Sequence, residues 1–227
     1  MPIFKTPNQS FRWLAAELIV VVLGVLIALA VSSWYENYQD VVLEKEILTQ
    51  FQASLTNQKV EIEERISRYN NQEIRIQTLL DHMNSGEPYN DELDNYFGAI
   101  TAFIGFQMDL SAYELLKSKG LYLISNDDLR SDLVTYYEIE YPGTHDRSEM
   151  SEEISRTLAV PFLNKHLIRL QGGGWKPIDY EALRNNVEIH NLAIGRLARI
   201  RTFISSGYDR SQQLIDDILN LIESELE

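Results

Sequence analysis

The chain of 227 residues contains no cysteine, which excludes disulfides, thiolate metal sites and cysteine nucleophiles. Its folded state must therefore be stabilised by packing, and the absence is compatible with oxidising and reducing compartments alike. Glycine and proline are missing from residue 35 to residue 82, so neither of the residues that interrupt helices occurs in this long stretch. The composition, with 44% hydrophobic residues, is typical of a chain that folds.

Positive charge is the scarcer charge in this sequence. Lysine and arginine together number 20 against 34 aspartates and glutamates, which gives a formal net charge of −14. Such a chain repels a polyanion such as nucleic acid. We therefore expect no nucleic-acid partner.

Patterns that mark common catalytic and metal sites are also absent. The sequence contains no HExxH, GxSxG, SxxK or GxxxxGK[ST] motif, and no histidine follows a glutamate by three residues, as di-iron bundles require. The four histidines are His82, His145, His166 and His190. The glycines at positions 172–174 precede Lys176, but the spacing of a phosphate-binding loop is not met. We predict a non-enzymatic protein with no catalytic residue, no cofactor and no metal.

An apolar run near the N-terminus is the strongest positive feature. Every residue from Leu18 to Val31 is apolar. Trp13 precedes the run, and Trp34 and Tyr35 follow it, so amphipathic rings would lie at both interfaces of a bilayer as anchors. A helix from Trp13 to Trp34 rises roughly 31 Å, about the hydrocarbon thickness of a bilayer. The sequence predicts one transmembrane helix at residues 13–34.

Two alternatives compete with this interpretation. A buried helix of a soluble core has no need for aromatic residues at both ends. A cleaved signal peptide is the more serious alternative, because Ala28-Leu29-Ala30 has the small-x-small form that signal peptidase recognises. Apolar character continues past this site through Val31, which favours a retained helix.

The flanking charges predict the orientation of this helix. Lys5 and Arg12 precede it without any acidic residue. The residues that follow it are mostly acidic: Glu36, Asp40, Glu44 and Glu46, with Lys45 among them. Because basic flanks stay in the cytoplasm, we expect residues 1–12 to form a cytoplasmic arm and residues 35–227 to form an acidic domain outside the membrane.

A single carboxylate, Glu17, interrupts the start of the apolar segment. Gly24, Ala28 and Ser32 follow it at spacings that place all four residues on one helical face. Small residues on such a face let a second helix approach closely in lipid, and a carboxylate there is better explained by a protein neighbour. We predict that this face packs against another membrane protein or a second copy. The alternative is that Glu17 only reaches back to the nearby interface.

The rest of the chain is predicted to be helical almost throughout. Apolar residues recur at steps of three, four or seven from residue 35 to residue 82, and clusters of turn-forming residues separate further helices. The predicted helices cover residues 35–82, 90–106, 111–119, 126–140, 146–170 with a kink at Pro161, and 179 to near the C-terminus. Ser111 and Glu114 have the form of a capping box. We identify no alternating strand pattern of useful length.

These elements predict an all-α fold, in which an extramembrane antiparallel helical bundle follows the transmembrane helix. A coiled coil is the alternative for residues 35–82, but Gln58 and Glu73 occupy positions that should complete its apolar seam. A narrow stripe with polar interruptions is more typical of a bundle.

Aromatic residues offer the remaining candidates for a binding surface. Tyr136, Tyr137 and Tyr141 are expected to be packing residues in the main, with a partner surface as the alternative, because tyrosine is favoured at interfaces. Trp175, in the irregular loop after the three glycines, is expected to cover one end of the bundle. A binding role for this loop is the second possibility.

Two stretches resemble a bacterial family of unknown function. The run Glu17-Leu-Ile-Val-Val-Val-Leu-Gly24-Val-Leu-Ile-Ala28-Leu, followed by Trp34, is similar to the start of a family of small single-span membrane proteins with the pattern E-[IL]-[IL]-x-V-x-x-G-[IV]-L-I-A-L and a later tryptophan. Residues 111–137, which end in the Tyr136-Tyr137 doublet, are similar to its second recurring pattern. The resemblance implies an anchored helical protein of the bacterial inner membrane, and it transfers no catalytic residue.

Together these features predict a membrane-anchored, non-enzymatic accessory subunit. It would dock to another membrane protein through its transmembrane helix and its helical bundle. The alternative is an extracytoplasmic domain that senses a ligand in its bundle and signals through a partner.

Overall fold

The computed structural model describes residues 7–227, including their side chains except those of residues 7–12 and 205. Helix accounts for 84% of it and there is almost no sheet, so the expected all-α class is confirmed. The first six residues of the predicted cytoplasmic arm, Lys5 among them, lie outside the described residues.

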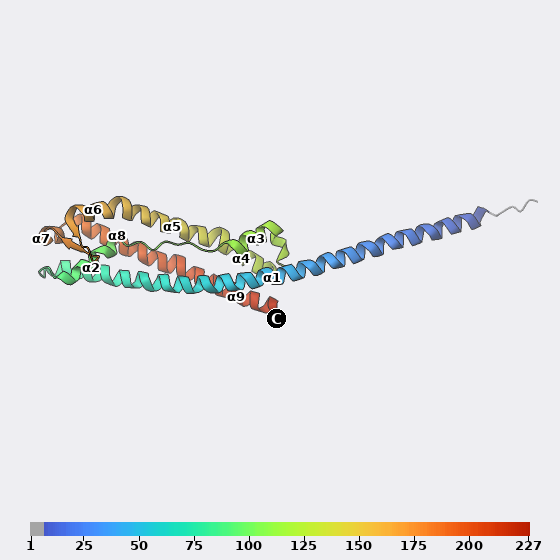
Figure 1. Cartoon of the computed structure of the whole chain (residues 1–227), viewed down its shortest axis with the longest axis horizontal. Coiled ribbons are helices and arrows are strands. Elements are labelled where there is room, and N and C mark those ends of the chain that lie inside the picture. Colours follow the sequence, from blue (N-terminus) through green and yellow to red (C-terminus); the bar gives the residue numbers. More distant parts are fainter. Residues whose placement is uncertain (1–6) are drawn as a thin grey trace, which may run out of the picture. The chain divides into compact units, whose positions relative to one another are not determined.

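The first helix, α1 (Pro7–Ser85), is one element of 79 residues (Figure 1). It contains both the predicted transmembrane segment and the predicted helix at residues 35–82, which are therefore continuous. The helix ends where Gly86 adopts a φ of 76°, and Pro88 cannot continue it because a proline nitrogen carries no hydrogen. The Ser85 hydroxyl donates a hydrogen bond of 2.9 Å to the His82 carbonyl and satisfies one of the last free carbonyls.

The chain divides into two units, residues 1–47 and residues 48–227, and α1 contributes to both. In the first unit the structure describes α1 from residue 7 onward. Its large apolar side chains from Trp13 to Val42 are all exposed, with Leu18 at 65% and Ile27 at 63%. Among the described residues, one helix is long and apolar enough to cross a membrane, and none of its most apolar window is buried.

Three helical rods make up most of the second unit (Figure 1). Rod 1 is the part of α1 from residue 48 to residue 85. Rod 2 (residues 127–166) joins α4 (Asp127–Thr135), the π-helical turn η4 (Tyr136–Glu140), α5 (Tyr141–Ile154), the π-helical turn η5 (Ser155–Ala159) and α6 (Val160–His166). Rod 3 (residues 187–226) joins α8 (Val187–Phe203), the π-helical turn η6 (Ile204–Tyr208) and α9 (Asp209–Leu226).

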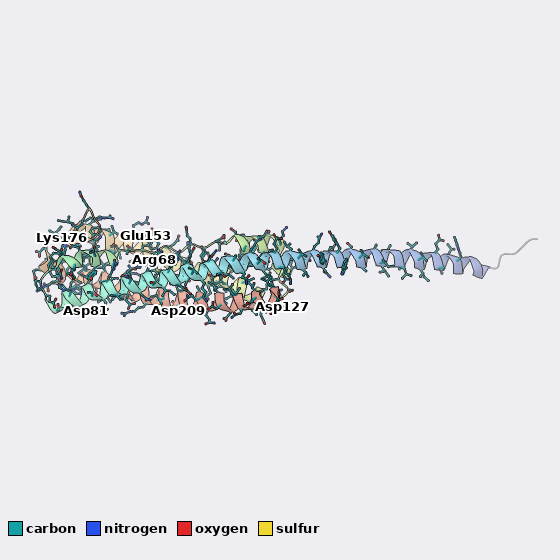
Figure 2. The ribbon with its side chains drawn as sticks, turned by 60° about the horizontal axis from the view of Figure 1, so that its bottom comes forward. Arg68, Asp81, Asp127, Glu153, Lys176 and Asp209 are labelled. Carbon is teal, nitrogen blue, oxygen red and sulfur yellow. The ribbon has the colours of Figure 1, made fainter. Side chains whose placement is uncertain are left out.

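The rods lie side by side and bury apolar side chains between them. Fully buried examples come from rod 1 (Phe51, Leu55, Ile62 and Ile76), rod 2 (Leu129, Leu133 and Leu163) and rod 3 (Ile200, Ile215, Ile218 and Ile222). The outer surface of this unit is charged along its length (Figure 2), as the exposed residues Arg68, Asp81, Asp127, Glu153, Lys176 and Asp209 illustrate. The second unit therefore has the apolar interior and polar exterior of a domain that faces water.

Shorter elements connect the rods. Between rods 1 and 2 the chain forms η1 (Asp91–Leu93), α2 (Asp94–Phe97), η2 (Gly98–Ile100), an extended segment at residues 101–110, α3 (Ser111–Lys119) and η3 (Leu121–Leu123). Between rods 2 and 3 lie β1 (Leu167–Arg169), β2 (Trp175–Pro177) and α7 (Tyr180–Arg184). The two strands form an antiparallel hairpin in which Ile168 is opposite Lys176.

Two predicted helices are longer than the observed ones. The helix predicted at residues 90–106 ends at Ile100, and the one predicted at residues 146–170 ends at His166, where a strand begins. Gly173 and Gly174 have positive φ values of 92° and 88°, which let the chain reverse tightly and pair β1 with β2. The pairing of the two strands satisfies the backbone groups that a longer helix would have satisfied.

The predicted helix starts are partly correct. Asn126 caps α4 by accepting a hydrogen bond from the N–H of Leu129 at 3.0 Å, as expected. The capping box at Ser111 is wrong, because the Asp109 carboxylate accepts from the N–H of Ser111 at 2.9 Å instead. Asp109 precedes the helix and is the better acceptor for a free N–H group near a helix start.

Prolines 142 and 161 do not end helices, which corrects the prediction that residues 141–143 terminate one. Each proline is the second residue after a π-helical turn, η4 or η5, and rod 2 continues through both. A proline inside an α-helix clashes with the carbonyl four residues earlier and lacks the N–H that would bond to it. A π-helical turn widens the helix by one residue at this place, so both problems are relieved.

The hairpin turn supplies a matched pair of glycine variants. A Cβ at residue 174 would lie 2.9 Å from the Asp94 carbonyl oxygen on a backbone with positive φ, whereas a Cβ at residue 172 would meet nothing within 4 Å. We expect Gly174→Ala to lower the free energy of unfolding by about 1–3 kcal/mol. Gly172→Ala should change it little. Chemical denaturation of the two variants checks this, and equal stabilities would contradict the described turn.

Candidate functional site

An extended segment, residues 101–110, runs among the helices of the second unit (Figure 1). Its side chains alternate along most of its length. Phe106 is buried and Ile104 and Met108 are half-buried, whereas Gly105 and Gln107 between them are exposed. This period of two is the period of a β-strand, although the segment has no strand partner among the described residues.

The carbonyl oxygens of this segment and of its approach accept hydrogen bonds from buried side chains. Such carbonyls would otherwise be unsatisfied inside the protein, which is unfavourable. The donors and acceptors are Gln58 to Asp109 (3.1 Å), Tyr69 to Ile104 (3.2 Å), Gln72 to Ala99 and Ala102 (2.5 and 2.9 Å), Ser155 to Thr101 (2.7 Å) and Arg196 to Ala102 (2.7 Å). All three rods therefore hold the extended segment in place through its backbone.

Arg196 is the centre of this network. It is only 1% exposed, and its guanidinium donates to the Ser151 hydroxyl at 2.5 Å and to the Gln72 side-chain oxygen at 3.2 Å. It also lies over the Tyr69 ring at 5.7 Å, which offers a cation–π contact. Burial lowers the pKa of Arg196, because no water surrounds the charge.

The N–H groups of the same segment are not used. Within residues 7–227, no acceptor is found for the backbone N–H groups from Phe103 to Met108. In this segment the carbonyl groups that face the core accept hydrogen bonds, whereas these N–H groups have no acceptor among the described residues. An extended segment with free donors is able to pair with another extended chain.

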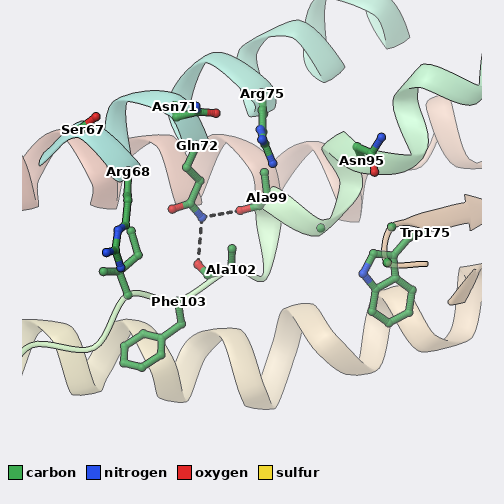
Figure 3. A pocket seen from close by; sticks show the side chains of 14 residues that line it. Ser67, Arg68, Asn71, Gln72, Arg75, Asn95, Ala99, Ala102, Phe103 and Trp175 are labelled. Carbon is green, nitrogen blue, oxygen red and sulfur yellow. Dashed lines mark hydrogen bonds between the residues drawn. The ribbon is translucent and has the colours of Figure 1, made fainter. Parts of the chain in front are cut away.

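A groove lies beside this segment, and we call it the basic groove (Figure 3). It has a volume of about 640 Å³ and is lined by residues 67–75 of α1, residues 95–104 and residues 173–175. The 14 lining residues include Arg68 and Arg75 and no aspartate or glutamate, although the chain has 34 acidic residues. The groove is therefore locally basic on an acidic protein.

The geometry of the groove follows from its three walls. Arg68 and Arg75 are seven residues apart on one face of α1, with Asn71 between them, and Phe103 and Trp175 lie toward opposite ends (Figure 3). The Trp175 ring lies 3.5 Å from the position that a Cβ at residue 98 would take, so the ring is close to Gly98 and even a Cβ there would meet it only at an ordinary van der Waals distance. Gln72 forms the floor through its hydrogen bonds to Ala99 and Ala102.

The basic groove offers donors rather than catalytic groups. Arg68 pairs with Glu64 at 3.1 Å, but both side chains are more than 60% exposed, so the pair holds the guanidinium weakly. Arg75 forms no ion pair within the described chain. Among the described residues no group of three or more histidine, aspartate or glutamate side chains is placed to hold a metal ion. The chemistry available is the binding of acceptors and negative charge.

The tyrosines proposed as a partner surface do not form one. Tyr136 is 0% exposed and Tyr137 is 4% exposed, and their rings pack edge to face at 5.0 Å. Burial raises the pKa of Tyr136, and it raises the pKa of Tyr137 to about 12. Tyr141 is half-buried against Phe106 at 5.6 Å between ring centres. The packing interpretation of these residues is the correct one.

Trp175 is 8% exposed, so most of its ring faces the protein rather than a partner. It nevertheless lines the basic groove, which the sequence did not indicate. Its placement at an end of the unit follows from the hairpin, where it is opposite Arg169 in β1. The loop after the three glycines thus contributes to a groove through one indole edge.

The residues predicted to pack in the membrane lie on α1. A Cβ at Gly24 would meet nothing within 4 Å, so its backbone is accessible. The Ser32 hydroxyl donates to the Glu36 carboxylate at 3.3 Å within the same helix. The role of Glu17 and Ala28 stays a prediction.

Sequence reasoning missed the extended segment, although a signal was available. Ile104, Phe106, Met108 and Leu110 alternate with Gly105, Gln107 and Asp109. The polar residue at position 58, taken as an interruption of an apolar stripe, is 5% exposed and donates to the segment. A glutamine at a position where the helical pattern expects an apolar residue was thus a sign that a non-helical segment with unsatisfied carbonyl groups packs there.

No family model, curated protein or solved structure matches the chain.

Two adjacent tyrosines test the hydrogen-bond network. The Tyr136 hydroxyl donates to the Gln58 side-chain oxygen at 3.1 Å, whereas the buried Tyr137 hydroxyl has no hydrogen-bond partner within residues 7–227. We expect Tyr136→Phe to lower the free energy of unfolding by about 1 kcal/mol, because it leaves a buried acceptor unsatisfied. Tyr137→Phe should leave stability unchanged or raise it slightly. Thermal denaturation of both variants measures this, and a larger loss for Tyr137→Phe would contradict the assignment.

Proposed function

We propose that this chain is a membrane-anchored, non-enzymatic accessory subunit that docks to another membrane protein. The observation that carries the proposal is the exposure of every large apolar side chain of α1 from Trp13 to Val31. Exposed apolar surface of this extent is unfavourable in water, and lipid removes it from water without any partner protein. The helix is also one in which all interior backbone groups are bonded, as a bilayer requires.

In this proposal residues 13–34 cross the inner membrane of a bacterium, with the N-terminal arm in the cytoplasm. The basic residues before the helix and the acidic residues after it support this orientation. Trp34 stacks on Tyr38 at 6.4 Å between ring centres, which extends the aromatic belt by one helical turn. The resemblance of the N-terminal segment to a family of single-span bacterial proteins points the same way.

We further infer that the three rods form a bundle outside the membrane, in which rod 3 runs antiparallel to rods 1 and 2. Two ion pairs between rods 1 and 3 support this arrangement: Lys59 with Asp216 at 2.5 Å and Glu73 with Arg201 at 2.8 Å. The partner numbers fall along rod 3 as they rise along rod 1, as antiparallel neighbours require. Rods 2 and 3 follow the same rule. Glu140 pairs with Arg210 at 2.8 Å, and Ser151, later in rod 2, bonds to Arg196, earlier in rod 3.

Docking in the membrane would use the face that carries Glu17, Gly24, Ala28 and Ser32. The open backbone at Gly24 supports close approach of another helix. A carboxylate on that face is satisfied more readily by a protein donor than by lipid.

A ligand-sensing domain that signals through a partner is the second candidate function. The observation that favours it is the basic groove, whose volume of about 640 Å³ is within the range of small-molecule sites. In this case the bundle would bind a ligand and the transmembrane helix would transmit the effect.

Membrane insertion is the first premise to test. Leu23→Arg places a charge near the middle of the predicted span and should raise the free energy of insertion by about 2.5–3.5 kcal/mol. Val60→Arg is the matched control, because Val60 is 52% exposed on rod 1. We expect wild type and Val60→Arg in the alkali-resistant membrane pellet and a reduced membrane fraction for Leu23→Arg. Full release of the wild type by alkali would refute anchoring.

Docking is the second premise. Gly24→Leu fills the small face, whereas Val22→Leu places the same residue type on the opposite side of the helix and adds one methylene group there. Tagged full-length chains are purified from native membranes in mild detergent, and co-purifying chains are quantified. We expect Gly24→Leu to recover about tenfold less partner, or second copy, than wild type, with Val22→Leu unchanged. A monomer without partners, or equal recovery by both variants, would count against the proposal.

A further inference from the structure

We propose that the basic groove binds an acidic, extended segment of a partner protein. The binding surface is formed by Arg68, Arg75 and the free N–H groups of the neighbouring extended segment. This inference rests on the proposed function as a partner-binding subunit and names the chemistry of one contact. It concerns the second unit alone, so its test is separate from the tests of the membrane helix.

Charge complementarity is the first argument. A chain of net charge −14 repels acidic partners over most of its surface, and the groove is lined by two arginines and no carboxylate. Two other hollows of the same unit are acidic by contrast. One is lined by Asp128, Asp132 and Asp217, and another by four carboxylates of rod 2 with Arg156. An acidic segment would therefore be directed to the basic groove.

Available donors are the second argument. Arg75 has no ion pair within the described chain, and the partner of Arg68 is an exposed glutamate that an incoming carboxylate can replace. The N–H groups of Phe103 and Ile104, two residues that line the groove, have no acceptor among the described residues. The donors that a peptide carbonyl and a carboxylate each need are thus present in one place.

Spacing is the third argument and distinguishes a peptide from a small anion. Seven residues of helix separate the two arginines by roughly 10.5 Å along the axis. An extended peptide advances about 3.3 Å per residue and directs every second side chain to one face, so carboxylates four residues apart, about 13 Å, lie on one face and are within reach of the two long arginine side chains. Two carboxylates at this spacing pair with one arginine each, whereas a small anion would reach both only if the two arginine side chains turned toward each other. An aromatic residue lies toward each end of the groove (Figure 3).

The direct test measures peptide binding to the full-length chain in nanodiscs of zwitterionic lipid by isothermal titration calorimetry. The probe is a capped seven-residue peptide with glutamates four positions apart, so that both side chains lie on one face of the extended chain. The comparison peptide carries glutamines at the same two positions, and succinate represents a small dianion. We expect the glutamate peptide to bind about tenfold more tightly than the glutamine peptide, with affinity that falls as salt is raised from 50 to about 150 mM.

Matched variants assign the binding to the groove. Arg75→Gln should weaken binding of the glutamate peptide about tenfold and Arg68→Gln somewhat less, because its glutamate pairing already offsets part of the charge. Arg156→Gln is the control, since Arg156 is 72% exposed in rod 2 and pairs with Glu153 in the same way. It should leave affinity unchanged. Circular dichroism confirms that each variant is folded.

Three results would overturn the proposal. These are equal binding of the two peptides, succinate competition at the same molar concentration as the glutamate peptide, and unchanged affinity of Arg75→Gln. Succinate competition would point to a small-anion site and to the sensing function instead. Failure of peptide binding while membrane insertion and co-purification succeed refutes only the groove assignment. The opposite pattern refutes the anchored docking function and leaves the groove.

Discussion

The carbonyl oxygens of an extended segment inside a helical domain determine much of this structure. Helices bond their own backbone, but residues 101–110 have no neighbouring strand in the described part of the chain, so their carbonyls must find side-chain donors. Gln58, Tyr69 and Gln72 in rod 1, Ser155 in rod 2 and Arg196 in rod 3 supply them. Each rod is fixed in register by a bond to the same short stretch of chain. The unit thus has a polar network where a simpler bundle would have an apolar core.

The buried face of α5 is adapted to the same constraint. Thr144, Ser148, Ser151 and Ser155 recur along it and are between 0% and 7% exposed. Their small side chains leave room for the extended segment and for Arg196, and two of their hydroxyls bond to those groups. This face is buried without being apolar, and the adjacent exposed face of α5 is acidic. Hydrophobic spacing therefore gives little information about how α5 is oriented.

The parts that sequence patterns predict well are those governed by local chemistry. α1 is continuous because residues 35–82 contain no glycine or proline, and the cap at Asn126 depends on one side chain and a nearby N–H. The predictions fail where contacts with residues distant in the sequence determine the structure. Residues 101–106 have a sequence typical of a helix, but Gln72 and Arg196 donate hydrogen bonds to a carbonyl of this stretch. Tyr136 is of a type favoured at interfaces, but its hydroxyl donates to Gln58 in the interior. The basic groove combines residues 67–75, 95–104 and 173–175, which no short motif could have joined.

The π-helical turns have a consequence for how rods 2 and 3 can vary. Each turn absorbs one extra residue, so the side chains after η4, η5 and η6 are rotated relative to those before them. A π-helical turn thus changes which way the following side chains face, while the rod itself continues. In rod 2, Leu133 before η4 is 0% exposed, and Ser151 after η4 is 2% exposed and accepts a hydrogen bond from Arg196, so the rod contributes buried side chains on both sides of the turn. Changes in chain length at these loci can be accommodated as a local twist, leaving the packing on either side intact.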